Sequence, residues 1–268
     1  MNRHQRVEVF NSTIRKISTD KGLKESLIYS IKEQKVIKDF IPLDSLPSPN
    51  KEGIIRLSRD RSFQAACRHS DKHVATLNFA SWTNPGGGVE SGSAAQEESL
   101  CRISTLFPAL NDERMMKEFY YPHRASSLKG IYNDDVIYTP DVTIFREDDD
   151  NMNFLTPDKW TRSDVITCAA PNLLAIKSVV IIDLESIFRN RFSKVLSISY
   201  QNNASCVVLG AFGCGVFGND PHLVAKATVD VLSKFRAYFD IIEVPVFCGA
   251  DTSNYDAFEK VFSAFDIL

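Results

Sequence analysis

The sequence predicts an α/β domain built on a largely parallel sheet, from three observations. Strand-like apolar runs recur along the chain, at residues 75–80, 164–171, 206–212 and 241–247. Segments with helical periodicity follow them, at 99–110, 184–200, 221–238 and 254–265. Two glycine-rich loops each connect a strand to a helix. Strands that alternate with helices are typical of a layered α/β fold, and 268 residues suffice for one large domain or two small ones.

The N-terminal part is expected to be simpler than the rest. An amphipathic helix is predicted at about 6–17, followed by a mixed segment and a loop rich in turn formers at 44–50. A short strand at 54–57 and a helix at 62–69 then lead into the strand at 75–80. No internal repeat and no clear linker between domains is visible.

The middle and the C-terminal half contain three local signals. Pro140 lies inside the strand-like run 136–145 and predicts an edge strand or a bulge there. The charged run 146–151 predicts a solvated turn. Pro221 marks the first turn of the helix that follows the second glycine loop.

Composition limits the possible functions and the cellular compartment. The formal net charge of −3 supplies no overall basic field, so we expect no direct sequence-specific binding of nucleic acid. Six cysteines without a C-x-x-C pair indicate a reducing compartment without disulfides. The N-terminus lacks an apolar signal core, and no apolar run reaches the ~18 residues of a membrane helix. We therefore expect a soluble intracellular protein, cytoplasmic or nuclear, with no membrane contact.

No metal site is expected. His69 and His73 have the i,i+4 spacing that can bind a metal on a helix, but no third ligand is evident nearby. The sequence therefore predicts that they form a surface pair.

The first glycine loop is Asn84-Pro85-Gly86-Gly87-Gly88, and Gln96, Glu97 and Glu98 follow after seven residues of spacer. The loop follows a predicted strand, and the two carboxylates fall in the first turn of the next helix. Glycines let backbone N–H groups approach an anion closely, and a helix N-terminus adds partial positive charge. This arrangement indicates acid chemistry beside a phosphate.

The second glycine loop has glycines at 210, 213, 215 and 218, with Val216 and Phe217 at its crest. In open α/β sheets ligands lie beyond the carboxyl ends of the strands, so both loops could hold one diphosphate. Gly213, Gly215 and Gly218 also match the dinucleotide fingerprint. Only 50 residues remain after Gly218, too few for the second half of a dehydrogenase, so we favour a nucleotide-diphosphate loop of another fold.

Together these motifs resemble the microbial-type poly(ADP-ribose) glycohydrolases, whose signature is three glycines, a spacer of six to eight residues, and Gln-Glu-Glu. The resemblance covers roughly residues 75–265. It implies a macrodomain-like three-layer α/β/α sandwich with a mixed sheet. Residues 1–50 would form an N-terminal helical extension packed on a catalytic macrodomain at 51–268. The segments that carry the resemblance are 77–80, 84–88, 95–99, 137–142, 167–172 and 210–219.

The resemblance also implies residue roles. Glu98 would be the general acid and Glu97 would bind ribose hydroxyls, since neighbours on a helix point about 100° apart and cannot do the same work. Phe217 would pack on the terminal ribose. The remaining expected substrate contacts are Asn84, Gly86, Gly87, Gly88, Gln96, Gly213, Cys214, Gly215 and Val216. No cofactor and no metal is implied.

An acid catalyst at a helix N-terminus is under opposing influences. The helix end favours the charged carboxylate, whereas the neighbouring carboxylate, a bound diphosphate and exclusion of water favour the neutral form. We therefore expect Glu98 to take up its proton mainly in the substrate complex.

The expected substrate is poly(ADP-ribose) or ADP-ribosylated protein, the product is ADP-ribose, and the chain is expected to be a monomer that reverses ADP-ribosylation in the DNA damage response. Two alternatives stay open. One is a module that binds ADP-ribose without cleaving it, and the other is a hydrolase of single ADP-ribosyl modifications. Whether the enzyme cuts only polymer ends depends on what the first 50 residues cover.

Overall fold

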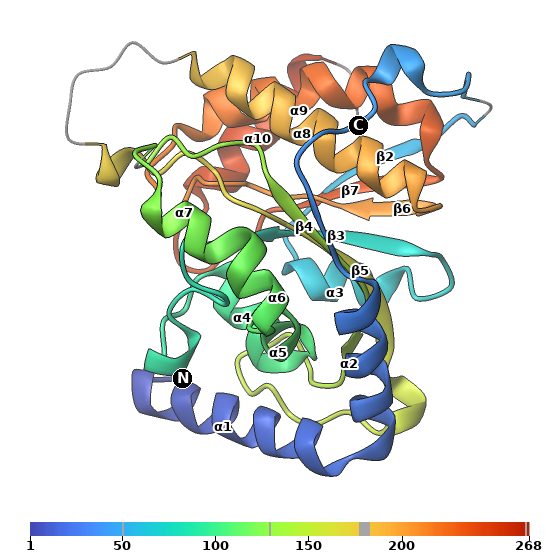
Figure 1. Cartoon of the computed structure of the whole chain (residues 1–268). Coiled ribbons are helices and arrows are strands. Elements are labelled where there is room, and N and C mark those ends of the chain that lie inside the picture. Colours follow the sequence, from blue (N-terminus) through green and yellow to red (C-terminus); the bar gives the residue numbers. More distant parts are fainter. Residues whose placement is uncertain (50, 129, 177–182, 266, 268) are drawn as a thin grey trace.

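A computed structural model describes residues 1–49, 51–128, 130–176, 183–265 and 267 (Figure 1). The described chain forms a seven-stranded mixed sheet with the order β1-β4-β5-β3-β6-β7-β2. The strands are β1 Lys35–Ile37, β2 Ile54–Ser58, β3 Val74–Phe79, β4 Val136–Ile144, β5 Thr161–Cys168, β6 Cys206–Val208 and β7 Ile241–Pro245.

The predicted parallel sheet is found in the run β5-β3-β6-β7-β2, in which every neighbouring pair is parallel. β4 is antiparallel to both of its neighbours, β1 and β5. Pro140 interrupts the register between Thr139 and Val142, which confirms the bulge among the two alternatives for this strand. A proline cannot donate to the ladder, so the bulge lets β4 stay inside the sheet.

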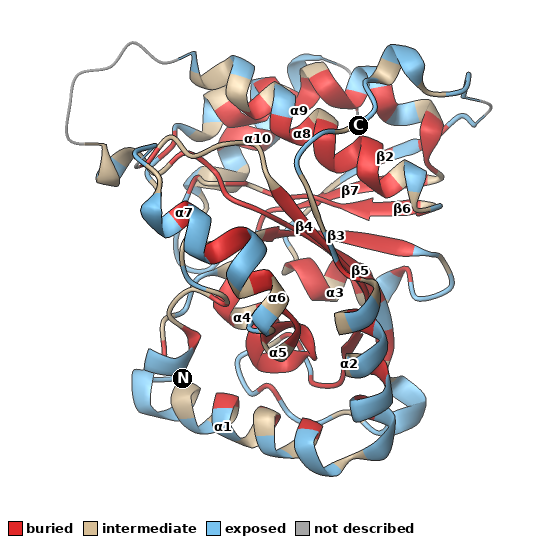
Figure 2. Ribbon diagram, viewed as in Figure 1, coloured by how far each residue is buried: buried red, intermediate tan, exposed pale blue. Residues whose placement is uncertain are grey.

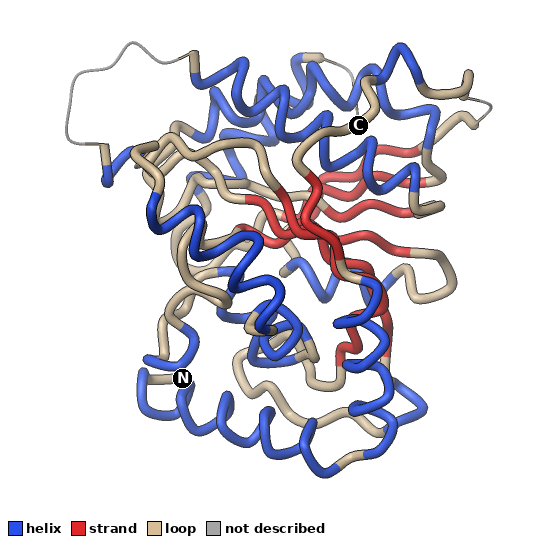
Figure 3. The backbone as a smooth tube through the Cα atoms, in the orientation of Figure 1, coloured by secondary structure: helices blue, strands red, loops and turns tan. Residues whose placement is uncertain are grey.

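One face of the sheet is covered by three long helices, α8 Leu184–Gln201, α9 Pro221–Phe235 and α10 Ser253–Ala264 (Figures 1 and 3). Pro221 occupies the first turn of α9, as predicted. Phe188, Phe192 and Leu232 pack there with Leu77 and Val207 of the sheet in one buried cluster. The three helices confirm the predicted α/β layering on this side.

Short helices cover the other face, and the predicted single helix at 99–110 is divided in two. Ser104 is extended, with φ −144° and ψ 179°, and forms an antiparallel bridge with Ile144 of β4, which breaks the helix at this residue. This layer comprises α3 Ser62–Arg68, α4 Gln96–Ile103, α5 Leu106–Leu110, α6 Glu113–Met115, a π-helical turn Met116–Tyr120 and α7 Tyr121–Ala125.

The N-terminal segment is more regular than predicted. α1 Arg3–Thr19 starts with a capping box formed by Asn2 and Gln5, and α2 Lys21–Glu33 occupies the stretch expected to be mixed. β1 then adds a strand beside β4. The outer face of α1 is exposed, whereas Phe10 is buried against the short-helix layer (Figure 2). A division of the chain at residue 50 stays a prediction.

Short 3-10 turns complete the described chain, at Leu43–Ser45, Val89–Ser91, Pro157–Lys159, Leu173–Ala175 and Arg236–Tyr238. Among all the described residues, no helix is long and apolar enough to cross a bilayer. All six cysteines are free thiols.

Two predictions of solvated polar groups are wrong in part, although Glu147, Asp150 and Asn151 of the charged run are exposed as predicted. In the charged run 146–151, Arg146 and Asp148 are buried, because Arg146 donates to Thr13 and to Met152 O while Asp148 accepts from the N–H of Phe63. His69 is likewise buried and lies 2.6 Å from the buried carboxylate of Glu243. His73 is exposed and lies 2.8 Å from Asp164, so the two histidines face different carboxylates.

Candidate active site

The two glycine loops leave neighbouring strands of the sheet. β3 and β6 are parallel and paired from Val74↔Cys206 to Thr76↔Val208. Parallel neighbours present their carboxyl ends at the same edge, so the loops that follow them lie at one end of the sheet. The sequence predicted this juxtaposition from the order of strands and loops alone.

Two carboxylates converge on Gly87. This residue has φ +59°, and a Cβ placed on it would lie 2.5 Å from Glu98 Oε1 and 3.1 Å from Glu97 Oε2. A side chain at position 87 would therefore meet both carboxyl groups, besides adopting a backbone conformation that L residues rarely adopt. The structure thus brings the glycine loop and the predicted catalytic pair into contact.

Glu97 is almost fully buried, with 2 % of its surface exposed. Its Oε2 accepts from the N–H of Ser81 at 2.7 Å, and its Oε1 accepts from Asn78 Nδ2 at 3.2 Å. Burial raises the pKa of Glu97 to about 8, and the charge of Glu98 acts in the same direction. Glu97 therefore retains a proton at neutral pH in the free protein.

Glu98 has one bonded and one unbonded oxygen. Its Oε1 accepts from the N–H of Gly88 at 2.9 Å, which fixes the carboxyl against the first glycine loop. No described residue makes a hydrogen bond to Oε2, although this atom is buried. An unsatisfied buried acceptor is costly, so Oε2 is the atom that a substrate hydroxyl or water would contact.

Gln96 connects three elements at the start of α4. Its Nε2 donates to Ser62 Oγ at 2.9 Å and to Leu77 O at 2.8 Å, and its Oε1 accepts from the N–H of Phe79 at 2.9 Å. Both amide hydrogens are thus used inside the protein. The side chain fixes the helix start against β3, whereas its predicted contact with substrate stays a prediction.

The second glycine loop is held by Asn219, which donates to Pro171 O at 2.8 Å and to Gly213 O at 2.9 Å. Gly213 has φ +81°, and a Cβ there would lie 2.5 Å from Ala170 Cβ. Gly215, in contrast, has no atom within 4 Å of its Cβ position. The loop therefore presses on the end of β5 at one point and is open at another.

The other predicted residues of this loop differ in exposure. Val216 is 70 % exposed, and Phe217 is half-buried against the main core. The Cys214 amide donates to Ala211 O at 3.2 Å within the loop, and burial raises the pKa of its thiol to about 12. The Cys214 thiol is therefore neutral at physiological pH.

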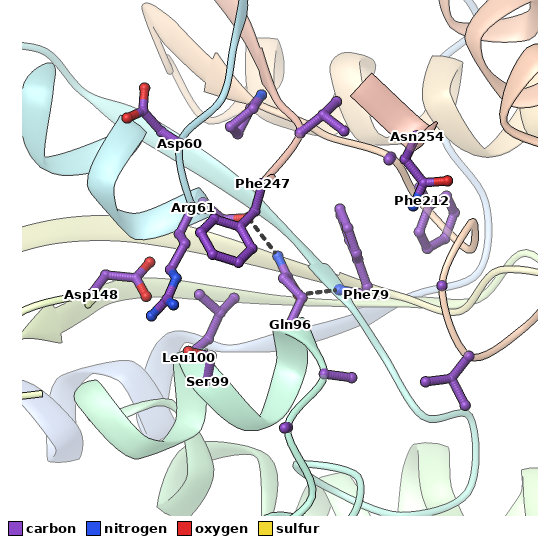
Figure 4. A pocket seen from close by; sticks show the side chains of 18 of the residues that line it. Asp60, Arg61, Phe79, Gln96, Ser99, Leu100, Asp148, Phe212, Phe247 and Asn254 are labelled. Carbon is purple, nitrogen blue, oxygen red and sulfur yellow. Dashed lines mark hydrogen bonds between the residues drawn. The ribbon is translucent and has the colours of Figure 1, made fainter. Parts of the chain in front are cut away.

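A cavity of about 490 Å³ adjoins the second loop (Figure 4). Gly213, Gly215, Val216 and Phe217 line it, together with Gln96 of α4. This volume is within the range of small-molecule sites. The cavity is not lined by the other predicted residues, which are Asn84, Gly86, Gly87, Gly88, Glu97, Glu98 and Cys214.

Most residues that line the cavity were missed by the sequence analysis, and Arg61 and Phe247 are two of them. The Arg61 guanidinium lies over the Phe247 ring, 4.4 Å from its centroid, and pairs with Asp150 (Figure 4). Arg61 lies three residues after the end of β2 and Phe247 two residues after the end of β7, at the edge of the parallel sheet where ligands bind. The available signal in the sequence was a phenylalanine at the carboxyl end of the predicted strand 241–247. In the structure Phe247 is 53 % exposed.

Within the described residues, no group of three or more His, Cys, Asp and Glu side chains could hold a metal ion. The site itself presents two carboxyl groups beside the backbone of the first glycine loop.

The family model for the catalytic domain of microbial-type PARG matches residues 9–147. No curated protein matches the chain. Among solved structures, the chain is similar to poly(ADP-ribose) glycohydrolase from Thermomonospora curvata, with 29 % identity and a TM-score of 0.84 over 97 % of this chain and 100 % of that one.

Two ligand complexes are similar as well. The T. curvata enzyme bound to the inhibitor ADP-HPD has 29 % identity and a TM-score of 0.83, over 96 % of this chain and 99 % of that one. The glycohydrolase from Deinococcus radiodurans in complex with ADP-ribose has 30 % identity and a TM-score of 0.78, over 89 % of this chain and 97 % of that one.

Proposed function

This chain belongs to the microbial-type poly(ADP-ribose) glycohydrolase (PARG) family, and from that premise we propose how its residues act on the polymer. The chain is a glycosidase that hydrolyses the ribose–ribose O-glycosidic bonds of poly(ADP-ribose) and releases ADP-ribose. The observation that carries the residue assignment is the convergence of Glu97 and Glu98 on Gly87.

Glu98 is the general acid in this proposal. Cleavage of the bond between the anomeric carbon and the next unit's oxygen builds positive charge on the ribose and negative charge on the departing oxygen. The proton on Glu98 Oε2 passes to that oxygen, which leaves as a hydroxyl. Glu98, now a carboxylate, takes a proton from the attacking water, and the water oxygen bonds to the anomeric carbon.

Glu97 binds the ribose hydroxyls beside the reacting carbon. Its two oxygens are fixed by the N–H of Ser81 and by the Asn78 amide, so the carboxyl cannot turn freely. Because Glu97 is buried and carries a proton at neutral pH, it can donate to a sugar oxygen as well as accept from a hydroxyl. Asn84 and the three glycines lie along the same sugar.

The diphosphate lies along the second glycine loop. Gly213, Gly215 and Val216 offer backbone N–H groups, while the Cys214 amide would first have to leave its turn with Ala211. Phe217 packs on the terminal ribose and holds the anomeric carbon near Glu98. The remaining nucleoside occupies the cavity beside Arg61 and Phe247.

The test compares wild type with Glu98→Gln on labelled polymer and on protein that carries single ADP-ribosyl groups. Release of ADP-ribose from polymer by wild type, and its loss in Glu98→Gln, supports the proposal. Binding without release would favour a reader of ADP-ribose, and release from single modifications alone would favour the third alternative. Glu90→Gln, an exposed neutralisation near the same loop, is the matched control and should keep wild-type activity.

We also propose an assembly state, a location, a range of substrates and a domain division for this chain. The chain acts as a monomer, inside the cell, on ADP-ribosylated protein as well as on polymer. Its first 50 residues form an extension packed on the catalytic domain. Sedimentation of the purified protein at micromolar concentration tests the monomer, and a dimer there would contradict it.

A further inference from the structure

The loop formed by residues 81–84 follows β3 and overlaps the first glycine loop at Asn84. It sets the position of Glu97. The N–H of Ser81 donates to Glu97 Oε2 at 2.7 Å. The Ser81 hydroxyl accepts from the N–H of Asn84 at 3.1 Å, which closes the loop on itself. Any shift of this loop therefore moves a hydrogen bond to Glu97 and the side chain of Asn84 together.

Helix α7 holds this loop at two adjacent points. The buried Trp82 ring stacks on His123, with centroids 4.1 Å apart and planes 14° apart. Next to it, Arg124 Nε donates to Thr83 O at 2.7 Å, and Arg124 Nη2 lies 3.4 Å from Asn84 Oδ1. The first contact is apolar and buried, and the second is a planar two-point contact at the surface.

The Arg124 contact also orients the Asn84 amide. A guanidinium can only donate, so the atom that faces it must be the amide oxygen. The Asn84 NH₂ group then points away from Arg124 and remains a donor. A substrate atom that meets it must be an acceptor, such as a ribose hydroxyl oxygen or a phosphate oxygen.

We propose that Arg124 is a positioning residue of the reaction, because it fixes the 81–84 loop and thereby the Glu97 carboxyl and the donor face of Asn84. This inference rests on the proposed roles of Glu97 and Asn84. Arg124 itself is exposed and holds the loop through Thr83 and Asn84. The buried Trp82–His123 stack keeps the fold when Arg124 is removed, so loss of Arg124 loosens the loop without unfolding the protein.

The experiment compares steady-state release of ADP-ribose from polymer by wild type and Arg124→Ala. We expect kcat to fall on the order of tenfold or more, since small displacements of positioned groups have large effects on rate, with a much smaller change in KM. The thermal midpoint should stay close to that of wild type. Added guanidinium ion should restore part of kcat in Arg124→Ala, because the vacated place is open to solvent. Lys117→Ala, which removes an exposed cation just before α7 that pairs with Glu113, should behave as wild type.

Arg124→Lys separates charge from geometry. The ammonium group keeps the charge but not the planar fork, so we expect kcat between the values of wild type and Arg124→Ala. This variant also serves if Arg124→Ala does not fold.

Wild-type kcat in a folded Arg124→Ala, or in Arg124→Lys, would overturn the inference. A fall in kcat that matches a loss of folded protein and does not respond to guanidinium would also overturn it. Inactive wild-type protein would instead contradict the proposed function itself.

Discussion

At the scale of single residues, opposing influences on the pKa of Glu97 determine whether its carboxyl group carries a proton. The start of α4 and the N–H of Ser81 favour the charged carboxylate, as the sequence led us to expect for this helix end. Burial favours the neutral form and is the largest influence, so the pKa of Glu97 is raised to about 8. Desolvation outweighs the helix end because the carboxyl is 2 % exposed.

This raised pKa predicts how stability depends on pH. The folded protein binds the Glu97 proton more tightly than the unfolded chain, whose pKa is the ordinary 4.5. The stabilising contribution is therefore complete below pH 4.5 and is lost as the pH rises through about 8. Glu97→Gln should melt at a higher temperature than wild type at pH 9, and the difference should shrink toward pH 5. Thermal unfolding across this range measures it, and a constant difference would contradict the raised pKa.

Gly87 gives a second prediction at this scale. In Gly87→Ala the new methyl group would lie 2.5 Å from Glu98 Oε1, in a backbone conformation with φ +59°. One carboxyl must move, so we expect kcat to fall on the order of a hundredfold, comparable to a misplacement of about 1 Å. Gly22→Ala in α2, whose Cβ would make only ordinary contacts of 3.5 Å, is the control for loss of a glycine and should keep the wild-type rate. Equal rates in Gly87→Ala and wild type would contradict the convergence of the carboxylates.

Phe217 gives a third prediction at the scale of single residues. If its ring holds the terminal ribose against Glu98, Phe217→Ala should reduce kcat more than it raises the dissociation constant of ADP-ribose. The second glycine loop would still bind the diphosphate through its backbone. Turnover of polymer and calorimetric binding of ADP-ribose give the two quantities, and an unchanged kcat would exclude this role.

At the scale of elements, the start of α4 is the joint on which the site depends. Gln96 ties this helix to β3 through Leu77 O and the N–H of Phe79, and to α3 through Ser62. The carboxylates of Glu97 and Glu98 then leave the first turn toward the glycine loop. A helix start fixed in this way keeps its position when the loops around it move.

Removal of this tie should affect both stability and rate. Gln96→Ala leaves buried polar groups of β3 without partners, at a cost of about 1–3 kcal/mol for each unsatisfied group. We expect a lower thermal midpoint and a lower kcat, because the first turn of α4 would no longer be fixed. Gln201→Ala, at the exposed end of α8, should change neither. A stable Gln96→Ala with normal kcat would show that other contacts suffice.

Local patterns predicted the elements that have strong periodicity or clear end signals. The strands at both glycine loops, α8 and α9 were found in this way. Ser104 was missed because the break it makes in the 99–110 helix depends on its bridge to Ile144, some forty residues away. The burial of Arg146 and Asp148 was missed for the same reason, since their partners belong to α1, the 146–152 segment and α3.

The candidate site likewise contains residues that were predicted from local spacing and residues that were missed because they depend on distant contacts. Glu97, Glu98 and the glycines are close in sequence, so their spacing alone brought them together. Arg61, Phe247 and Arg124 come from separate parts of the chain and meet the site only through the sheet order and the packing of α7. Spacing along the chain carries no information on such contacts.

At the scale of the whole molecule, helix α1 packs against the residues that follow the first glycine loop, and Met1 and Arg6 also line the cavity. Arg3 Nε of α1 donates to Ser91 O at 2.5 Å, and Arg6 Nε donates to Gly92 O at 2.7 Å. Both acceptors lie just after the first glycine loop. Phe10 packs edge-on against Phe107, with centroids 4.9 Å apart. Phe107 in turn lies so close to Gly86 that a Cβ there would meet its ring at 2.7 Å. Helix α1 is thus continuous with the packing under the glycines.

Phe10→Ala tests whether this support reaches the chemistry. Removal of a buried aromatic ring costs about 3–5 kcal/mol, so the thermal midpoint must fall. If Phe107 then relaxes into the vacated space, Gly86 loses its backing and the glycine loop gains freedom next to Glu98. We expect kcat measured well below the melting range to fall as well, whereas Glu8→Ala on the exposed side of α1 should keep both values. A destabilised Phe10→Ala with wild-type kcat would mean that α1 stabilises the fold but does not position the loop.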